Sequence, residues 1–156
     1  IIYYGDEIGM GDNIWLPDRH GCRTPMQWDA SQNAGFSRAD KPYFPVHAEY
    51  LQVNVKAQED EPDSYLNLTR FLIRVRQGQV ALRRGEMAWV ETGDTAVLAF
   101  RRFINDQGVL CLFNLSNQPQ KFALHHERRD LLSPKGSRLS GTIELKPFAA
   151  HWLVLA

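Results

Sequence analysis

Six short segments in which apolar and polar residues alternate occupy the chain from about Gly85 onward. They are MAWVE, TAVLAFRRF, GVLCLFNLS, QKFALHH, GTIELK and AHWLVLA, and clusters of Gly, Asn, Asp, Ser and Pro separate them. Parallel strands would need a helical crossover between each pair, and no helical pattern lies between these segments. Residues 81–156 are therefore predicted to form an antiparallel β-sandwich domain.

Residues 1–80 have a different pattern. The apolar stretch IIYY predicts a short strand that is covered on both faces, and we expect its partner strands to lie upstream of this sequence. A long loop rich in Gly, Asp, Asn and Pro follows, and it carries Trp15, Met26 and Trp28 without a neighbouring strand or helix to cover them. A loop of this length usually has a function or rests on another part of the protein. We therefore expect the first half to depend on a scaffold outside this sequence.

One helix is predicted between these two parts, from about Asp63 to Gln77. Its apolar residues Tyr65, Leu68, Leu72 and Val75 fall on one stripe, with Phe71 beside them. Acidic residues and a proline precede the helix, and arginines followed by a glycine close it, as expected at the two ends of a helix. The stripe predicts that this helix packs one face on an apolar surface.

Composition excludes two classes of partner. Lys plus Arg and Asp plus Glu both number 18, so the formal net charge is zero. A neutral chain offers no basic surface to nucleic acid, and no apolar run approaches the ~20 residues of a membrane helix. We therefore predict neither a nucleic-acid partner nor a membrane partner.

The two cysteines indicate a reducing compartment. Cys22 lies in a polar loop and Cys111 in the apolar run VLCLFNL, where a free cysteine is typically a small buried hydrophobe. Two free thiols are the expected state, so we predict a cytoplasmic protein. His20 and Cys22 supply at most two ligands, and a zinc site needs three or four, so no metal site is predicted.

Few residues suggest chemistry by themselves. Asp6 and Glu7 are neighbours, and neighbours on an extended chain point to opposite faces, so they make a poor acid/base pair. We expect Asp6 to accept hydrogen bonds from nearby backbone amides instead. Arg23 lies between a Gly and a Pro in GCRTPMQW, and its five donors suit a carboxylate or sugar hydroxyls. Without further context, a surface arginine that holds the loop in place is the simpler interpretation.

Two long motifs resemble a known family. IIYYGDEIGMGDN resembles the eighth barrel strand and following segment of the α-amylase superfamily, glycoside hydrolase family 13. RTPMQWDASQNAGFS resembles a loop of its α-glucosidase, oligo-1,6-glucosidase and trehalose synthase branches. VNVKAQEDEPDSYLNLTRFLIRVRQ is similar to the last barrel helix, and VLAFRR and VLCLFNLS are similar to strands of the C-terminal domain. The resemblance covers essentially the whole chain and is strongest over residues 1–40.

The resemblance implies a mixed fold: the end of a truncated (β/α)₈ barrel followed by an antiparallel β-sandwich. Residues 1–80 would hold strand 8, its loop and helix 8 of the catalytic barrel, and residues 81–156 would be the C-terminal domain. Ile1–Tyr4 would be the eighth strand, and Gly5–Phe36 the loop above the sugar pocket, at the strand ends where such barrels carry their sites. This part is expected to pack against the missing part of the barrel.

The family's chemistry is shared between this chain and earlier strands. Its retaining enzymes use an Asp nucleophile, a Glu general acid/base and a second Asp, and none of these matches a position here. No catalytic residue is therefore assigned, and the chain alone is expected to be inactive. The arginine of RTPMQW pairs in the family with an upstream Asp and bonds a hydroxyl of the terminal glucose, which makes Arg23 the predicted substrate-binding residue. The implied substrate is a maltose-like α-glucoside, with neither metal nor cofactor bound by this chain.

Two questions stay open at this point. GDNIWLPDR is most similar to the trehalose synthase loop, although Trp15 and Pro17 depart from its usual Tyr and Gly, so an α-glucosidase or a glycosyl-transferring relative is the alternative. A different class of protein, a free-standing sugar-binding β-sandwich module, would use Trp89 and Trp152. Both tryptophans lie in apolar strand contexts, which favours a place in the core.

Overall fold

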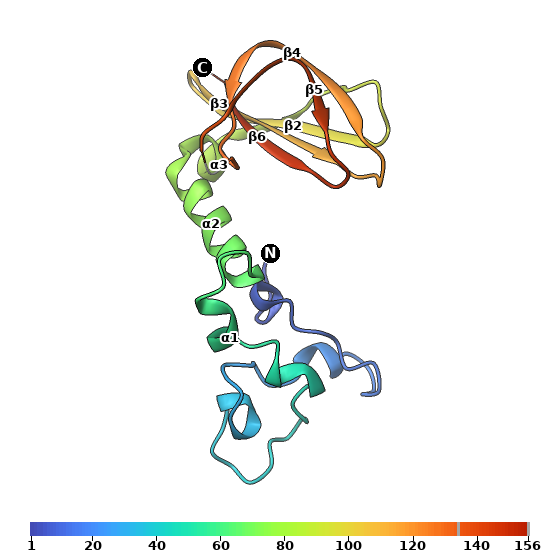
Figure 1. Cartoon of the computed structure of the whole chain (residues 1–156), viewed down its shortest axis with the longest axis vertical. Coiled ribbons are helices and arrows are strands. Elements are labelled where there is room, and N and C mark those ends of the chain that lie inside the picture. Colours follow the sequence, from blue (N-terminus) through green and yellow to red (C-terminus); the bar gives the residue numbers. More distant parts are fainter. Residues whose placement is uncertain (134, 156) are drawn as a thin grey trace. The chain divides into compact units, whose positions relative to one another are not determined.

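The computed structural model describes residues 1–133 and 135–155, and it divides into two compact units, Ile1–Phe71 and Leu72–Ala156. We refer to them as the loop unit and the β unit (Figure 1). The predicted domains, residues 1–80 and 81–156, concern the architecture of a whole enzyme and stay a prediction.

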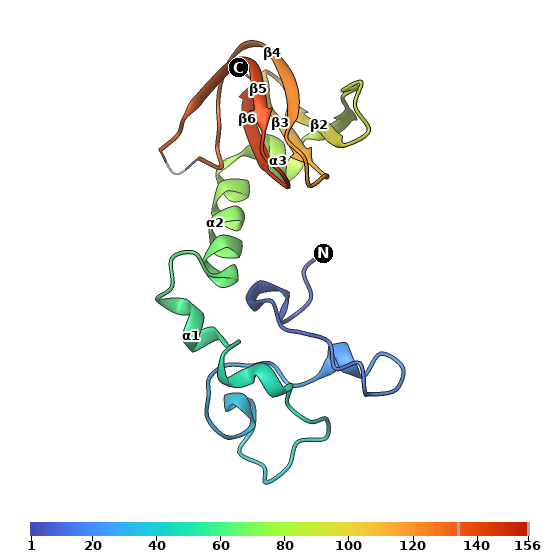
Figure 2. The same cartoon turned by 45° about the vertical axis from the view of Figure 1, so that its right-hand side comes forward.

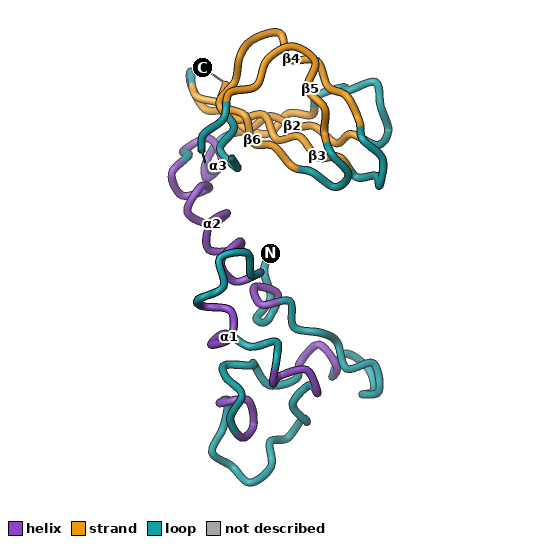
Figure 3. The backbone as a smooth tube through the Cα atoms, in the orientation of Figure 1, coloured by secondary structure: helices purple, strands orange, loops and turns teal. Residues whose placement is uncertain are grey.

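Short helical turns joined by loops make up the loop unit (Figure 3). No strand forms among residues 1–71, so the strand predicted at Ile1–Tyr4 is absent from this chain. The physical reason is that a strand needs a hydrogen-bonded neighbour, and the loop unit contains none. The helical elements of this part are η1 (Asp6–Ile8), η2 (Gly21–Arg23), η3 (Gln32–Gly35), η4 (Ala48–Leu51) and α1 (Val55–Glu59).

The predicted long helix is confirmed as α2 (Tyr65–Gly78). The Ser64 hydroxyl accepts a hydrogen bond from the Asn67 amide at 3.2 Å, which caps the first turn. The predicted packing stripe is only partly covered in this chain, because Tyr65 is 66% exposed and Leu68 50% exposed, whereas Leu66 is buried. Neither α2 nor any other helix in the described part of the chain has the length and apolar content needed to cross a membrane.

The six predicted strands are all present in the β unit, and Figure 2 labels β2 to β6. One antiparallel sheet has the order β1-β2-β3-β6, and β4 pairs with β5 in a second antiparallel sheet. The strands are β1 (Glu86–Trp89), β2 (Val97–Ile104), β3 (Gln107–Asn114), β4 (Gln120–Arg129), β5 (Arg138–Leu145) and β6 (Ala150–Leu155).

The core of the β unit lies between its two sheets. Alternate residues along each strand point inward, as the period of two requires. The larger sheet contributes Val97, Ala99, Leu110, Leu112 and Leu153, and the smaller sheet contributes Leu124, Ile143 and Leu145.

The outer face of the larger sheet is covered in part by α3 (Val80–Arg84), a helix that the sequence pattern did not predict. Leu82 packs there on Val109 and Cys111, with Trp152 partly buried beside them. Trp89 lies on the edge strand β1 and is 63% exposed, so its predicted place in the core is wrong for this chain. An edge strand has a neighbour on one side only, and nothing in the described part of the β unit buries this ring.

The two cysteines have different environments, as the sequence predicted. Cys22 is exposed, Cys111 is buried on β3, and both are free thiols. Burial raises the pKa of the Cys111 thiol to about 11, although the nearby positive charge of Arg102 acts in the opposite direction.

We expect iodoacetamide to label Cys22 and to leave Cys111 unmodified in the native chain at pH 8. The thiolate is the reactive form, and Cys111 is both inaccessible and protonated at this pH. Mass spectrometry of peptides before and after unfolding in guanidinium measures the effect, and both cysteines should react in the unfolded chain. Equal labelling of the two cysteines in the native chain would contradict this packing of β3.

Asn114 joins three segments at one end of the β unit. It is buried, and its amide nitrogen donates to the carbonyls of Gln118, Leu145 and Lys146 at 2.7, 3.1 and 2.9 Å. Its Oδ1 atom accepts from the amide and the hydroxyl of Ser116. One side chain therefore joins the end of β3 to Ser116 and Gln118 and to Leu145 and Lys146 through five hydrogen bonds.

Replacing Asn114 by Ala should lower the free energy of unfolding by about 2–4 kcal/mol, because the five hydrogen bonds of one buried side chain are lost together. Urea unfolding followed by circular dichroism measures this loss. Asn117→Ala, an exposed change three residues away, is the matched control and should stay within about 0.5 kcal/mol of the original chain. A loss at Asn114 no larger than at Asn117 would show that these hydrogen bonds do not stabilise the unit.

Candidate functional site

The turn after residues 1–4 is fixed by two glycines and two carboxylates. Gly5 and Gly9 flank η1 in the left-handed region, with φ of 93° and 69°. The Asp6 carboxylate accepts a hydrogen bond from the Tyr3 amide at 2.8 Å, which confirms the predicted role, and the Glu7 carboxylate accepts one from the Gly5 amide at 2.8 Å. Both acidic side chains hold the turn.

A small apolar core ties this turn to the RTPMQW segment. Ile8, Met26 and Leu66 are buried together. The Gln58 side chain donates from Nε2 to the Ile8 carbonyl at 2.7 Å and accepts at Oε1 from the Leu66 amide at 3.0 Å. Met26 thus finds a packing surface inside this chain.

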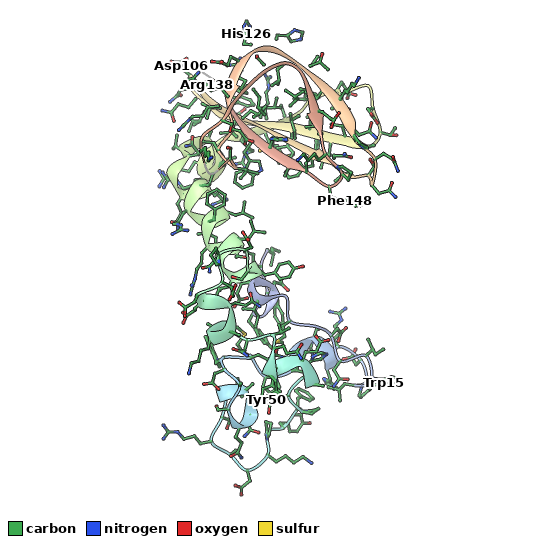
Figure 4. All side chains as sticks on the ribbon, viewed as in Figure 1. Trp15, Tyr50, Asp106, His126, Arg138 and Phe148 are labelled. Carbon is green, nitrogen blue, oxygen red and sulfur yellow. The ribbon has the colours of Figure 1, made fainter. Side chains whose placement is uncertain are left out.

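The other two large side chains of the loop do not find such a surface. Trp28 is 51% exposed and Trp15 is 88% exposed, and Trp15 extends from the tip of its loop (Figure 4). Their predicted need for a packing surface is not met by the described residues.

Arg23, the predicted substrate-binding residue, is exposed at the end of η2. Its amide donates to the His20 carbonyl at 3.1 Å, and the Tyr4 hydroxyl donates to the carbonyl of the next residue, Thr24, at 3.0 Å. Two backbone hydrogen bonds therefore fix the position of the Arg23 backbone, while the side chain stays in solvent.

Electrostatics link Arg23 to Tyr4 as well. Burial raises the pKa of the Tyr4 hydroxyl, the neighbouring Tyr3 adds to the rise, and the positive charge of Arg23 acts against it. Residues 1–133 and 135–155 contain four ion pairs, and none of them involves Arg23. Its guanidinium is available for a carboxylate or for hydroxyl groups.

Gly21 is required for this geometry. It is buried, and a Cβ atom at this position would overlap the Asp12 carboxylate and the Asn13 carbonyl. The turn that presents Arg23 can therefore form only when residue 21 has no side chain.

A neighbouring pocket of about 410 Å³ is lined by Tyr4, Glu7, Met26, Trp28 and Phe36. The sequence did not assign it. The pocket depends on the NAGF motif, in which three consecutive residues, Asn33 to Gly35, adopt positive φ of 53°, 55° and 68°. A left-handed φ is unfavourable for Ala, whereas Asn is one of the few other residues that adopt it.

Hydrogen bonds to the backbone hold the NAGF turn in place. The buried Ala34 accepts at its carbonyl from the amides of Trp28 and Asp29, at 2.9 and 3.2 Å. Asn33 Nδ2 donates to the carbonyls of Ser37 and Ala39. The turn sets the path of the backbone into Phe36, whose side chain lines the pocket.

Several buried polar atoms of the loop unit have no partner among residues 1–133 and 135–155. They are the Thr24 hydroxyl, both amide atoms of Gln27 and the Nδ1 atom of His20. Thr24 and Gln27 are fully buried. Among the same residues, no group of three or more His, Cys, Asp or Glu side chains is arranged to hold a metal ion.

Replacing Gly21 by Ala should loosen the Arg23 turn, because the added methyl group forces the backbone away from Asp12 and Asn13. We expect amide hydrogen exchange over residues 19–28 to become about tenfold faster, which corresponds to about 1.4 kcal/mol. Gly78→Ala is the control, because a Cβ atom there meets no neighbouring atom. Unchanged exchange in Gly21→Ala would contradict the close packing at this glycine.

Residues 1–85 match the alpha-amylase family, in the part described as "Alpha amylase, catalytic domain". This match covers more than half of the chain, and the chain therefore belongs to the alpha-amylase family. The resemblance inferred from residues 1–40 is confirmed.

Among similar proteins is the trehalose synthase/amylase TreS of Mycobacterium tuberculosis, which is 42% identical in an alignment 153 residues long; the alignment covers 92% of this chain and 25% of TreS. A probable alpha-glucosidase of Rhizobium meliloti is 33% identical in an alignment 152 residues long, which covers 86% of this chain and 27% of that protein. The chain thus spans about a quarter of the length of these curated relatives.

A solved structure shows the same fold. The trehalulose synthase MutB from Pseudomonas mesoacidophila MX-45 matches 99% of this chain and 35% of its own, with a TM-score of 0.83 and 24% sequence identity. The alternative of a free-standing sugar-binding module is not supported, because the family match begins at residue 1 and the relatives are named as synthases and glucosidases.

Proposed function

We propose that this chain is part of a longer alpha-amylase-family enzyme that hydrolyses or isomerises the α-glucosidic bond of maltose-like substrates with retention. The names of its relatives support the bond type, because they include trehalose synthases and an alpha-glucosidase. The catalytic carboxylates would come from other parts of that enzyme, so the chain alone would be inactive. The two free thiols support a reducing, cytoplasmic location.

Arg23 carries this proposal. Its guanidinium is exposed and has no ion-pair partner among the described residues, while hydrogen bonds fix the backbone on both sides of it. A fork of donors on a fixed backbone suits recognition of a sugar hydroxyl beside a carboxylate. We assign Arg23 to the floor of a terminal-glucose site, with the carboxylate supplied by another segment of the enzyme.

The rest of the loop unit would be completed by that enzyme. Ile1–Tyr4 would become the eighth barrel strand once neighbouring strands pair with its backbone. Each unpaired buried group at Thr24 and Gln27 costs about 1–3 kcal/mol, so partners from other segments or water would stabilise the loop.

The pocket lined by Tyr4, Glu7, Met26, Trp28 and Phe36, here called the aromatic pocket, suits protein packing better than sugar binding. Its only charged lining residue is Glu7, whose carboxylate already accepts the Gly5 amide. A sugar site needs several convergent polar groups, and Arg23 is not in this lining. We therefore propose that an apolar segment of the barrel fills this pocket.

Residues 81–156 would form a C-terminal domain that stabilises the enzyme.

Replacing Arg23 by Ala in the full-length enzyme should lower kcat/KM for maltose about 100-fold, because a charge-assisted pair of hydrogen bonds is worth about 3 kcal/mol. Arg23→Lys should recover little of this activity, since one ammonium group cannot reproduce the two parallel N–H donors of a guanidinium group. The release of glucose and the formation of trehalose are both measured by chromatography.

Arg19→Ala removes an exposed arginine from the same loop and serves as the matched control, with activity expected within twofold of the original. The 156-residue chain alone should show no turnover. Equal activity of the Arg23 and Arg19 variants would refute the role of Arg23, and enzyme-like turnover by the isolated chain would refute the proposed division of the site.

A further inference from the structure

The β unit contains a pocket of about 620 Å³ that is separate from the site of Arg23. Its floor is apolar and is formed by Leu110 of β3, Phe122 and Leu124 of β4, and Leu155 of β6. These residues belong to the core between the two sheets or pack against it. The pocket is therefore an opening of the core to the surface, and its volume suits a small organic molecule.

An arginine extends the inward-facing row of β2 into this opening. Val97 and Ala99 point into the core, and Arg101 follows at the next inward position, paired with Leu110 of β3. Its guanidinium carbon lies 5.0 Å from the centre of the Phe103 ring. None of the ion pairs in residues 1–133 and 135–155 involves Arg101.

A bulge in β4 shapes the opposite wall. Leu124 pairs with Gly141 and Arg128 with Leu139, so three residues of β4 lie opposite one residue of β5. Bulges redirect side chains and often occur beside binding sites. Here the bulge brings His125, His126 and Arg128 into the pocket lining, and Figure 4 marks the position of His126 on β4.

The charges around the pocket favour an anion. Arg101 and Arg128 supply two positive charges and Glu91 supplies one negative charge, while His125 and His126 are formally neutral. The nearby carboxylate of Glu127 is already paired with Arg138 at 2.9 Å. An apolar floor with two arginines in the same lining complements a ligand that has an apolar body and an anionic head.

We propose that this pocket binds a small amphipathic anion, with its apolar body on the leucine and phenylalanine floor and its phosphate or carboxylate head between Arg101 and Arg128. The site lies outside the loop unit and is independent of the α-glucoside chemistry proposed for Arg23.

Calorimetric titration of the full 156-residue chain tests this proposal with three probes. The probes are 1-naphthyl phosphate, octanoate and the uncharged 1-naphthol. We expect saturable 1:1 binding of at least one anion, at least about tenfold tighter than 1-naphthol and weakened by 0.5 M NaCl, since salt screens the two arginines. Binding of the phosphate alone or of octanoate alone identifies the head group.

Three charge-neutralising variants locate the site. Arg101→Gln and Arg128→Gln should each weaken anion binding about tenfold, and Glu91→Gln should tighten it about two- to fivefold, because a like charge is removed. Arg83→Gln, an exposed arginine of α3, is the matched control and should leave affinity within twofold. Circular dichroism verifies that each variant is folded.

Three results would overturn the proposal. The first is the absence of saturable binding by either anion, and the second is binding of 1-naphthol as tight as that of the phosphate. The third is weaker anion binding by Glu91→Gln, which cannot arise from loss of a repulsive charge. The Arg23 variants bear only on the other site, so the two proposals fail separately.

Discussion

Every buried backbone N–H and C=O group needs a hydrogen-bond partner, and the two units meet this requirement by different means. In the β unit, strand ladders pair most of the backbone, and Asn114 bonds the carbonyls at the end of β5. The loop unit has no ladder, so backbone hydrogen bonds within turns pair many of its groups and amide side chains add to them. Gln58 joins Ile8 to Leu66, and Asn67 donates to the carbonyls of residues 58, 59 and 61. A few polar side chains therefore determine the geometry of the loop unit.

These side-chain hydrogen bonds explain how an exposed loop can hold the backbone of Arg23 in a defined place. The Arg23 backbone is fixed through Thr24 to the Tyr4 hydroxyl, and three residues later Met26 enters the apolar core with Ile8 and Leu66. Loops carry function when a rigid neighbour positions them, and here the neighbour is a small core closed by Gln58. The cost is that polar atoms at Thr24 and Gln27 are left without partners in the described residues.

The elements that the sequence predicted are those whose signal is local and repeated. A period of two located all six strands, and the apolar stripe located α2. The five residues of α3 are too few to show a helical period, and the strand at residues 1–4 depends on partners that no local pattern describes. The motif identified Arg23 as a candidate whose role stays a prediction, whereas the aromatic pocket beside Tyr4 was not assigned, because it depends on left-handed φ angles at Asn33 and Ala34. The exposure of Trp89 was missed since apolar character alone does not reveal which face of a sheet is covered.

The contrast between Arg23 and Arg101 indicates why the two proposed sites would take different ligands. Neither arginine forms an ion pair within the described residues. Arg23 projects from a polar turn, so in the proposed site it would bind only polar groups, such as hydroxyls and a carboxylate supplied by another segment. Arg101 continues the apolar inward-facing row of β2 and lines a pocket with leucine side chains. A ligand bound there would gain binding free energy both from the charge of Arg101 and from the burial of its apolar surface. In the two proposed sites, the same guanidinium group would therefore favour different ligands, because the surroundings of Arg23 are polar and those of Arg101 are partly apolar.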